Sequence, residues 1–568
     1  MTFDRFLAEA ADRLGKALQS LGYDHRVKNE DWESPPEGMG DCTFPCWRLG
    51  PHPERIAGEL VDVLSSSTGD LIARWEARGP YVNCFADWAR MGASTLLAIL
   101  RERERYGHGA PKGVRTIVEH TSANPNGPLH VGNARNPVIG DSLARILKAS
   151  GYEVETEYYV NDMGKQVAVM VWGMGHLPPE EGEEKKKEDH VLVRYYQRAS
   201  GAAVEEEVGA LLAQYEAGKE PTVKRIHKAC ERVLSGIQQS LTSINVSIDR
   251  YQWESELVRG GTVSAVIDRL KKTPYYREEG GATFLTMEGE KEKLFLTRKD
   301  GTTLYTTRDI AYHLNKFERA DDVIDVLGED HRLESEQLAA VLKGLGYPQP
   351  RVVFYSFVTL PAGEGKMSTR RGRVVYLDDL VGETIQRAYR EVDKRRPDLP
   401  EEKKRRIAEL VGVGALRYNI VKVQPEKSIV FRWDEALDFK GASAPFIQYA
   451  HARACGILRK GGWSMDRVSE EQIALYCKAL NDERERAVIR ALSRFPTIVR
   501  ASASNLRPDT VAEYAYDLAS ALNKFYQSLP VLRGEPGVRE ARLALVSTTR
   551  QVLSNALDLL GITAPEEM

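Results

Sequence analysis

The sequence predicts an α/β protein built around a doubly wound, Rossmann-like parallel sheet. Short apolar segments alternate with amphipathic helical patterns between about residues 114 and 358. The connections are short, and this strand–helix–strand order is typical of a parallel sheet with helices on both faces. After about residue 400 the strand signals stop and only helical patterns remain, which predicts an α-helical bundle.

The predicted parts follow in order along the chain. Residues 1–110 combine helical patterns with a short strand and predict an N-terminal α+β domain. Residues 111–400 form the predicted catalytic domain, with a mostly helical insertion at about 165–290 and with strands expected at VRTIVEH, GYEVETEYYV, TTLYTT, DVIDVLG and RVVFYSFV. The charged stretch DLPEEKKRR marks the next boundary, and residues 401–568 form the predicted helical bundle.

Composition and charge exclude several classes of protein. The 79 Lys and Arg residues nearly balance the 82 Asp and Glu residues, so bulk charge does not favour nucleic-acid binding, although a local basic face is not excluded. The first helix carries acids and does not resemble a targeting peptide, and no apolar run has the length of a membrane span. Cys42 and Cys46 lack the partner pair that a zinc site needs. We therefore expect a cytoplasmic protein with structural cysteines.

The segment VEHTSANPNGPLHVGN is the first candidate site, because a strand leads through a Pro/Gly/Asn turn into a helix. In a doubly wound fold this place is the carboxyl edge of the sheet, where free N–H groups at a helix start favour a phosphate. His130 and Asn133 add side-chain hydrogen bonds, and Gly132 leaves room for a flat base. Taken alone, the pattern is also compatible with a buried structural histidine.

A basic loop at residues 363–372, GEGKMSTRRG, follows the last predicted strand. Its positive charge suits a triphosphate, although a single basic run is usually a solvated surface turn. The two motifs together are more specific than either one, and neither is a Walker loop or a dinucleotide-binding glycine loop.

HVGN resembles the HIGH signature, and KMSTR the KMSKS signature, of class I aminoacyl-tRNA synthetases. The contexts VEHTSANPNGPLHVGNARN, YVNDMGKQ, LYTTRDIAYHL, QYAHAR and LLGITAPEEM resemble the arginyl-tRNA synthetases, especially those of archaeal type, over nearly the whole chain. The resemblance implies an enzyme that activates arginine with ATP and Mg²⁺ to arginyl-adenylate, releases pyrophosphate, and transfers arginine to the 3′-terminal adenosine of tRNA(Arg). It also implies a monomer.

The resemblance further implies residues on both sides of the triphosphate. Two positions depart from the family signatures, because Asn133 stands where the family has histidine and Thr369 stands where many members have a second lysine. Which basic residue of the loop replaces that lysine stays open. The implied catalytic residues are His130, Asn133, Lys366, Ser368 and Arg370, and the implied ATP-binding residues are His130, Gly132, Asn133, Lys366, Met367 and Ser368.

For the amino acid, the resemblance implies a pocket that presents carboxylates and a flat aromatic ring to a guanidinium. Asp309 and Glu119 are expected to face the guanidinium, with Tyr305 packed beside it. Asn124 is expected to hold the α-amino end, and His331 stands where the family often has glutamine, so its contact stays open. In isolation, Asp309 would be interpreted as a helix N-terminal acid and Glu119 as a surface acid.

In the bundle, QYAHAR resembles an anticodon-binding segment, which implies that Tyr449 and Arg453 contact unpaired bases. The alternative is that Tyr449 belongs to the core of its helix. The N-terminal domain resembles the additional domain that arginyl enzymes use against the tRNA elbow.

Three other functions account for parts of the sequence pattern. A cysteinyl-type synthetase needs zinc-ligating Cys and His residues, and none has a suitable spacing. A catalytically weakened or non-catalytic tRNA-binding paralogue is favoured by the altered HVGN and KMST positions, but the pocket residues and the basic loop are retained together. A nucleotidyltransferase without a tRNA function would not need the helical C-terminal third.

Overall fold

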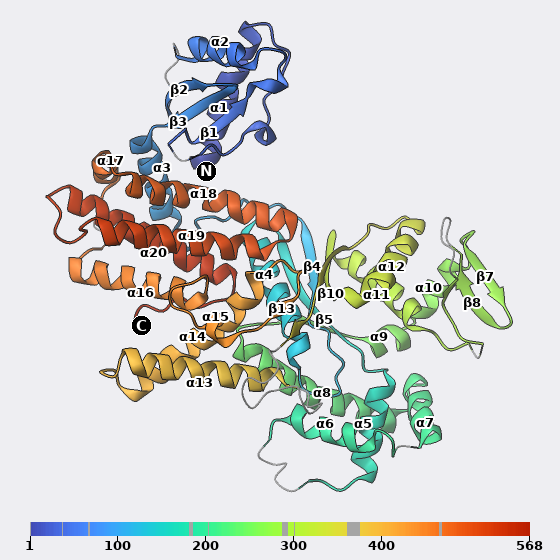
Figure 1. Ribbon diagram of the computed structural model, residues 1–568. Coiled ribbons are helices and arrows are strands. Elements are labelled where there is room, and N and C mark those ends of the chain that lie inside the picture. Colours follow the sequence, from blue (N-terminus) through green and yellow to red (C-terminus); the bar gives the residue numbers. More distant parts are fainter. Residues whose placement is uncertain are drawn as a thin grey trace.

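The computed structural model describes residues 2–36, 38–65, 69–180, 186–202, 204–286, 293–299, 301–359, 375–464 and 468–568. Within these residues the chain forms an N-terminal α+β part, a central α/β part with inserted segments, and a C-terminal helical bundle (Figure 1). None of the helices in this described portion combines the length and apolar character needed to cross a membrane.

The N-terminal part contains α1 (Thr2–Ser20), β1 (Cys42–Pro45), α2 (Pro53–Ser65), β2 (Ile72–Arg78), β3 (Tyr81–Ala86) and α3 (Trp88–Glu102). Its three strands form an antiparallel sheet in the order β1-β3-β2, and α1 and α2 pack with this sheet around a separate apolar core. Cys42 and Cys46 are buried in that core. They therefore pack as small apolar side chains.

The central sheet has five strands, and every neighbouring pair is parallel. Its elements are β4 (Arg115–Glu119), α4 (Arg135–Ala149), β5 (Glu153–Val160), β6 (Arg250–Trp253), α11 (Tyr305–Arg319), β10 (Asp322–Gly328), α12 (Arg332–Gly344) and β11 (Arg351–Tyr355). The predicted doubly wound fold is thereby confirmed. The strand order is β11-β10-β4-β5-β6, so β5 and β6 lie on one side of β4, β10 and β11 lie on the other, and the order reverses between β4 and β10. A ligand crevice forms at the carboxyl ends of strands at such a reversal.

Helices α5 (Lys165–His176), α6 (Glu188–Ala199), α7 (Glu205–Glu216) and α8 (Glu220–Ser243) lie between β5 and β6. A second segment precedes α11 and contains α9 (Glu254–Arg259), α10 (Thr262–Leu270), β7 (Tyr276–Glu279), β8 (Ala282–Leu285) and β9 (Leu294–Phe295). The helical range expected at about 165–290 is therefore divided by β6, which belongs to the central sheet. Because β6 is only four residues long and lacks an apolar run, the sequence pattern does not reveal it.

The prediction of a strand at TTLYTT is wrong, because helix α11 begins within this segment at Tyr305. Threonine and tyrosine favour strands on average, but this preference is weak and depends on context. Here the hydroxyl of Thr307 donates to the carbonyl of Leu296 at 2.6 Å, which fastens the first turn of the helix to the preceding chain. The consequence is that Tyr305 and Asp309 lie on successive turns of one helix.

The bundle contains α13 (Leu377–Arg395), α14 (Glu401–Val421), α15 (Trp433–Ala436), α16 (Ala444–Gly461), α17 (Glu470–Ala479), α18 (Glu483–Asn505), α19 (Pro508–Ser528) and α20 (Val538–Leu559). The two-residue strands β12 (Val358–Thr359) and β13 (Ile429–Val430) pair where the central part meets the bundle. One continuous apolar core joins the bundle to the central sheet. Helix α3 packs on α17 and α18, so the N-terminal part lies against the bundle (Figure 1).

Candidate active site

A cavity of about 860 Å³ lies at the carboxyl edge of the central sheet, where the strand order reverses. Its walls come from the turn after β4, the end of β10 and the first turns of α11 and α12. The HVGN turn and the first turn of α11, which are far apart in the sequence, therefore meet around one space. Six of the residues predicted from the sequence line this cavity: Asn124, His130, Asn133, Tyr305, Asp309 and His331.

The HVGN motif forms a tight turn on one side of this cavity. His130 has an extended backbone, and Val131–Asn133 make a single 3₁₀ turn before α4 begins. A Cβ atom on Gly132 would lie 2.9 Å from Nδ1 of His130, so glycine makes room for the imidazole over the turn. Partial burial lowers the pKa of His130. The turn therefore presents a neutral imidazole and the Asn133 amide as hydrogen-bonding groups.

The chain that follows the basic loop is fastened to the same turn. The N–H of Val131 donates to the carbonyl of Val375 at 2.9 Å, and the N–H of Leu377 donates to the carbonyl of Leu129 at 2.8 Å. The structure thus places the segment after the KMSTR motif directly beside HVGN. Four predicted residues of the motif lie outside the described residues, namely Lys366, Met367, Ser368 and Arg370.

The turn after β4 has a strained backbone and is held by a side-chain hydrogen bond from α4. Thr121 and Ser122 have φ angles of 73° and 35°, which a β-branched residue such as threonine rarely adopts. Asn136 on α4 accepts the Thr121 N–H at 2.6 Å and donates to the carbonyl of Val326 at 2.9 Å. One amide therefore ties the ends of β4 and β10 to α4, and this over-determined geometry holds the strained turn at the cavity wall.

The opposite wall carries two carboxylates. Asp309 lies one helical turn after Tyr305 on α11, and its side chain is 42% exposed. Glu254 begins α9, lines the same cavity and is buried, and it accepts a hydrogen bond from Nη1 of Arg308 at 3.2 Å. Burial raises the pKa of Glu254, although Arg308 opposes this. The sequence prediction missed Glu254, because no sequence pattern reveals the short strand β6 that precedes it.

Asn124 is exposed beside this wall and shares a partner with Asn126. Both side-chain amides donate to Oε1 of Gln166, at 3.2 Å and 2.9 Å respectively. Gln166 lines the cavity and was not predicted from the sequence. The two asparagines and the glutamine form a polar corner with donors and acceptors for a small polar ligand group.

Glu119 is buried behind the cavity wall. It is the last residue of β4, is 8% exposed, and is not among the described residues that line the cavity. Its carboxylate is ion-paired with Nζ of Lys316 on α11 and accepts a hydrogen bond from the Ser122 hydroxyl at 2.8 Å. The interpretation as a surface acid is therefore wrong, and a direct contact with arginine stays a prediction.

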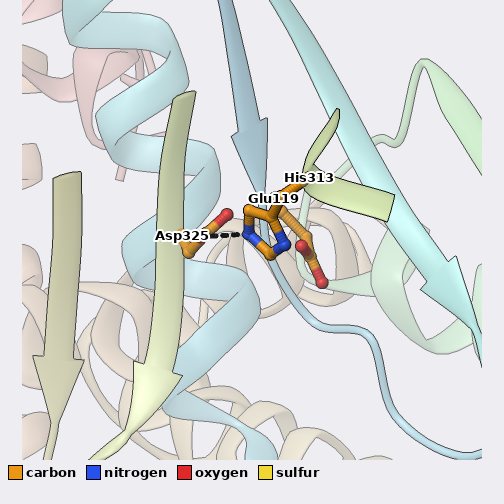
Figure 2. A group of neighbouring side chains, drawn as sticks. All are labelled: Glu119, His313 and Asp325. Carbon is orange, nitrogen blue, oxygen red and sulfur yellow. Dashed lines mark hydrogen bonds and ion pairs between the residues drawn. The ribbon is translucent and has the colours of Figure 1, made fainter. Parts of the chain in front are cut away.

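Two clusters of histidine and carboxylate groups have the compact arrangement of a cation site, but each already contains a lysine. The first is Glu119, His313 and Asp325 (Figure 2), and the second is Asp189, His190 and Asp378. Nζ of Lys316 lies 2.8 Å from Asp325 in the first cluster, and Nζ of Lys187 lies 3.3 Å from Asp189 in the second. The ammonium groups supply the positive charge that a metal ion would bring.

A second candidate surface lies on the bundle. The guanidinium of Arg453 lies 4.6 Å from the ring centre of Tyr449 and 5.6 Å from that of Tyr526, and its Nη1 donates to Asn523 at 3.2 Å. Tyr449 is 40% exposed and Tyr526 is 37% exposed, so Tyr449 is not a core residue. Tyr526 comes from α19 and was not predicted, because no sequence pattern links it to α16.

Known proteins resemble this chain over nearly its whole length. Residues 95–433 match the family described as tRNA synthetases class I (R), catalytic domain, and residues 447–568 match the DALR anticodon binding domain. The chain is 46% identical to an arginine–tRNA ligase of Methanocella arvoryzae, covering 92% of each chain. It is 44% identical to that of Methanothermobacter thermautotrophicus, covering 99% of each. The solved arginyl-tRNA synthetase of Thermus thermophilus superposes with a TM-score of 0.81 at 28% identity, covering 98% of this chain and 99% of that one.

Proposed function

The chain belongs to the arginyl-tRNA synthetases of class I, and from that membership we propose roles for the residues of its cavity and its bundle. The enzyme is an arginine–tRNA ligase. It activates L-arginine with ATP, releases pyrophosphate, and transfers the arginine to the 3′-terminal adenosine of tRNA(Arg). The observation that carries the site assignment is that one cavity joins the HVGN turn to a wall with two carboxylates.

In the first step, an oxygen of the arginine α-carboxylate attacks the α-phosphorus of ATP, and the bond to pyrophosphate breaks. This reaction depends on alignment and on stabilising the charge of the phosphate oxygens more than on covalent help from the protein. We assign the alignment to His130 and Asn133, with Gly132 giving the nucleotide room. We propose that the loop residues approach from the other side, namely Lys366, Met367, Ser368 and Arg370. The hydrogen bonds that fasten residues 375–377 beside HVGN support this arrangement.

We propose that Mg²⁺ enters together with ATP. The side chains beside the HVGN turn are an imidazole and an amide, which suit phosphate oxygens, whereas Mg²⁺ prefers carboxylate, phosphate and water oxygens. Phosphate and water would therefore be its main ligands. Its chemical contribution is to offset the negative charge that accumulates on the leaving pyrophosphate.

Recognition of the arginine side chain is assigned to Asp309, Glu254 and Tyr305. A guanidinium is planar, permanently charged and rich in donors, so it needs several acceptors in fixed positions. Asp309 offers an accessible carboxylate and Glu254 a buried one, and Tyr305 offers a ring that is 59% exposed. Asn124, supported by Gln166, holds the α-amino end. His331 lines the same cavity, and we assign no contact to it.

In the second step, a ribose hydroxyl of the terminal adenosine attacks the carbonyl carbon of arginyl-adenylate, and AMP leaves. The test of the whole assignment is aminoacylation of purified tRNA with arginine, with lysine and cysteine as controls. We expect charging with arginine and a kcat/KM for lysine lower by about 10⁴-fold, because a site built for a guanidinium leaves buried acceptors unpaired with an ammonium. Failure to charge with any of the three would favour the non-catalytic paralogue.

We propose that Tyr449, Arg453 and Tyr526 form a platform for unpaired bases of the tRNA anticodon loop. Stacking of one base on an aromatic side chain contributes about 1–3 kcal/mol, so Tyr449→Ala should raise the KM for tRNA about 5- to 150-fold. The KM for arginine at saturating tRNA should stay within about threefold. Leu475→Ala, which shortens a 64% exposed apolar side chain on α17, is the matched control. An unchanged KM for tRNA in Tyr449→Ala would remove this residue from the platform.

We further propose that the N-terminal α+β part contacts the tRNA elbow, that the enzyme acts as a monomer, and that it works in the cytoplasm. The six cysteines are buried and unpaired, as suits a reducing compartment.

A further inference from the structure

Five charged side chains alternate in sign behind the arginine-binding wall, and we call them the charge chain: Asp309, His313, Asp325, Lys316 and Glu119. Nδ1 of His313 lies 3.1 Å from Oδ1 of Asp309, and Nε2 lies 2.9 Å from Oδ2 of Asp325. Nζ of Lys316 lies 2.8 Å from Oδ1 of Asp325 and is ion-paired with Glu119. Figure 2 shows His313 beside Asp325 and Glu119.

The charge chain leads from the cavity into the core. The side chain of Asp309 is 42% exposed at the cavity, whereas that of His313 is 5% exposed and that of Lys316 is fully buried. Burying charged groups is costly unless each one is paired, and an ion pair is weak evidence for stability by itself. A run of five paired charges that begins at the proposed specificity carboxylate therefore indicates a role in the site.

Both ring nitrogens of His313 face acceptors. Nε2 lies 2.9 Å from the Asp325 carboxylate and 3.4 Å from Nζ of Lys316, and Nδ1 faces the carboxylate of Asp309 and also the backbone carbonyl of Asp309 at 2.9 Å. A ring that donates from both nitrogens is an imidazolium. Burial and the nearby Lys316 oppose this charge, but Asp325 and Asp309 outweigh them and raise the pKa of His313 to about 10.

We propose that His313 is a positioning residue for arginine recognition, which holds Asp309 by Oδ1 and leaves Oδ2 directed to the guanidinium of the substrate. This inference rests on the proposed role of Asp309 in the arginine pocket. The imidazolium holds the Asp309 side chain in one rotamer before arginine binds. The entropy cost of ordering this side chain is therefore not added to the cost of binding. Asp325 and Lys316 in turn hold His313 in place.

The other end of the charge chain reaches the opposite wall. Glu119 accepts from the hydroxyl of Ser122 at 2.8 Å, and that hydroxyl oxygen accepts the backbone N–H of Tyr159 at 3.0 Å. Ser122 and Tyr159 both line the cavity. The charge chain therefore connects α11 to the turn that carries Asn124.

The test is a double-mutant cycle in the full-length enzyme, with Asp309→Asn, His313→Gln and the double variant assayed by tRNA aminoacylation. Glutamine donates from one amide nitrogen and cannot serve both carboxylates. His313→Gln should raise the KM for arginine by roughly 10- to 100-fold, the effect of losing one charge-assisted hydrogen bond, with the KM for ATP and kcat within about threefold. Glu318→Gln, an exposed acid on the same helix, is the matched control and should change neither KM.

The cycle separates this inference from the proposal on which it rests. If His313 acts through Asp309, His313→Gln should change the arginine KM by less than about threefold when Asp309→Asn is already present. Equal effects in both backgrounds, or an equal rise in the KM for ATP, would overturn the inference. An Asp309→Asn enzyme with a normal arginine KM would instead overturn the proposed role of Asp309.

A measurement on the unaltered enzyme keeps the inference testable if the His313 variants do not fold. The charged groups that face His313 are Asp309, Asp325, Lys316 and, further away, Glu119. Since its pKa is raised to about 10, His313 keeps its proton from pH 6 to 8.5. The KM for arginine should therefore stay within about twofold over this range. A tenfold rise with a midpoint between pH 6 and 7.5 would show a neutral ring and contradict the inference.

Discussion

Replacing Asp309 with alanine is expected to raise the KM for arginine by about 30- to 900-fold, since the loss of a charge-assisted contact to a desolvated guanidinium costs about 2–4 kcal/mol. The substitution removes the accessible carboxylate of the pocket and also leaves the His313 imidazolium without its side-chain partner on that side. The KM for ATP should change little, because the HVGN turn lies on the other side of the cavity. Initial rates of aminoacylation at varied arginine and varied ATP separate the two effects.

Glu318→Ala is the control for this substitution, because it removes an exposed acid from the same helix outside the cavity. It should leave both KM values within about twofold of the unaltered enzyme, as expected for a surface position. An arginine KM in Asp309→Ala within a few-fold of the unaltered enzyme would remove Asp309 from the pocket and leave Glu254 as the acceptor.

Replacing Arg417 with methionine is expected to lower the free energy of unfolding by about 3–5 kcal/mol, because it leaves several buried carbonyls without their donor and a buried carboxylate with only one of its two arginines. The Arg417 side chain is fully buried, and Nη2 lies 2.5 Å from Asp141 of α4. It also donates to the carbonyls of Leu560 at 2.8 Å and Ile244 at 2.6 Å. A Cβ atom on Gly561 would lie 2.1 Å from Nη2, so the glycine of LLGIT is needed to admit the guanidinium.

Arg145→Met is the matched control, because Arg145 binds the same Asp141 at 2.8 Å but its side chain is 26% exposed. Arg145→Met should lower the free energy of unfolding by less than about 1 kcal/mol, as is typical of ion pairs near the surface. Urea denaturation followed by fluorescence gives the midpoint of unfolding for each variant, and these midpoints rank the two variants by stability. Equal midpoints for the two variants would show that Arg417 does not hold α4, α8 and the C-terminal segment together.

The fold class could be predicted because β4 and β10, in the middle of the central sheet, are buried on both faces and are therefore largely apolar. The prediction failed where that signal is absent or misleading. Strand β6 has four residues and no apolar run, and TTLYTT has the composition of a strand but starts helix α11. Tertiary contacts decided both cases, since β6 pairs with β5 at the sheet edge and Thr307 is bound to Leu296.

Residues from several local motifs meet in the structure. His130, Asn133, Asn124, Tyr305 and Asp309 line one cavity. Glu254 and Tyr526 were missed, because each meets its neighbours only after helices from distant parts of the sequence pack together. The roles of these residues in binding remain proposals that the variants above test.

By itself, the sequence determined the family, the reaction and the order of the main elements, because these depend on short motifs and on periodic apolar patterns. The tertiary structure alone decided which carboxylates line the cavity. Glu119 matches the family pattern as closely as Asp309 does, yet it is paired with Lys316, which lies 197 residues away in the sequence. No local pattern predicts such a partner, and in a buried site the partner determines whether a carboxylate is available to a ligand.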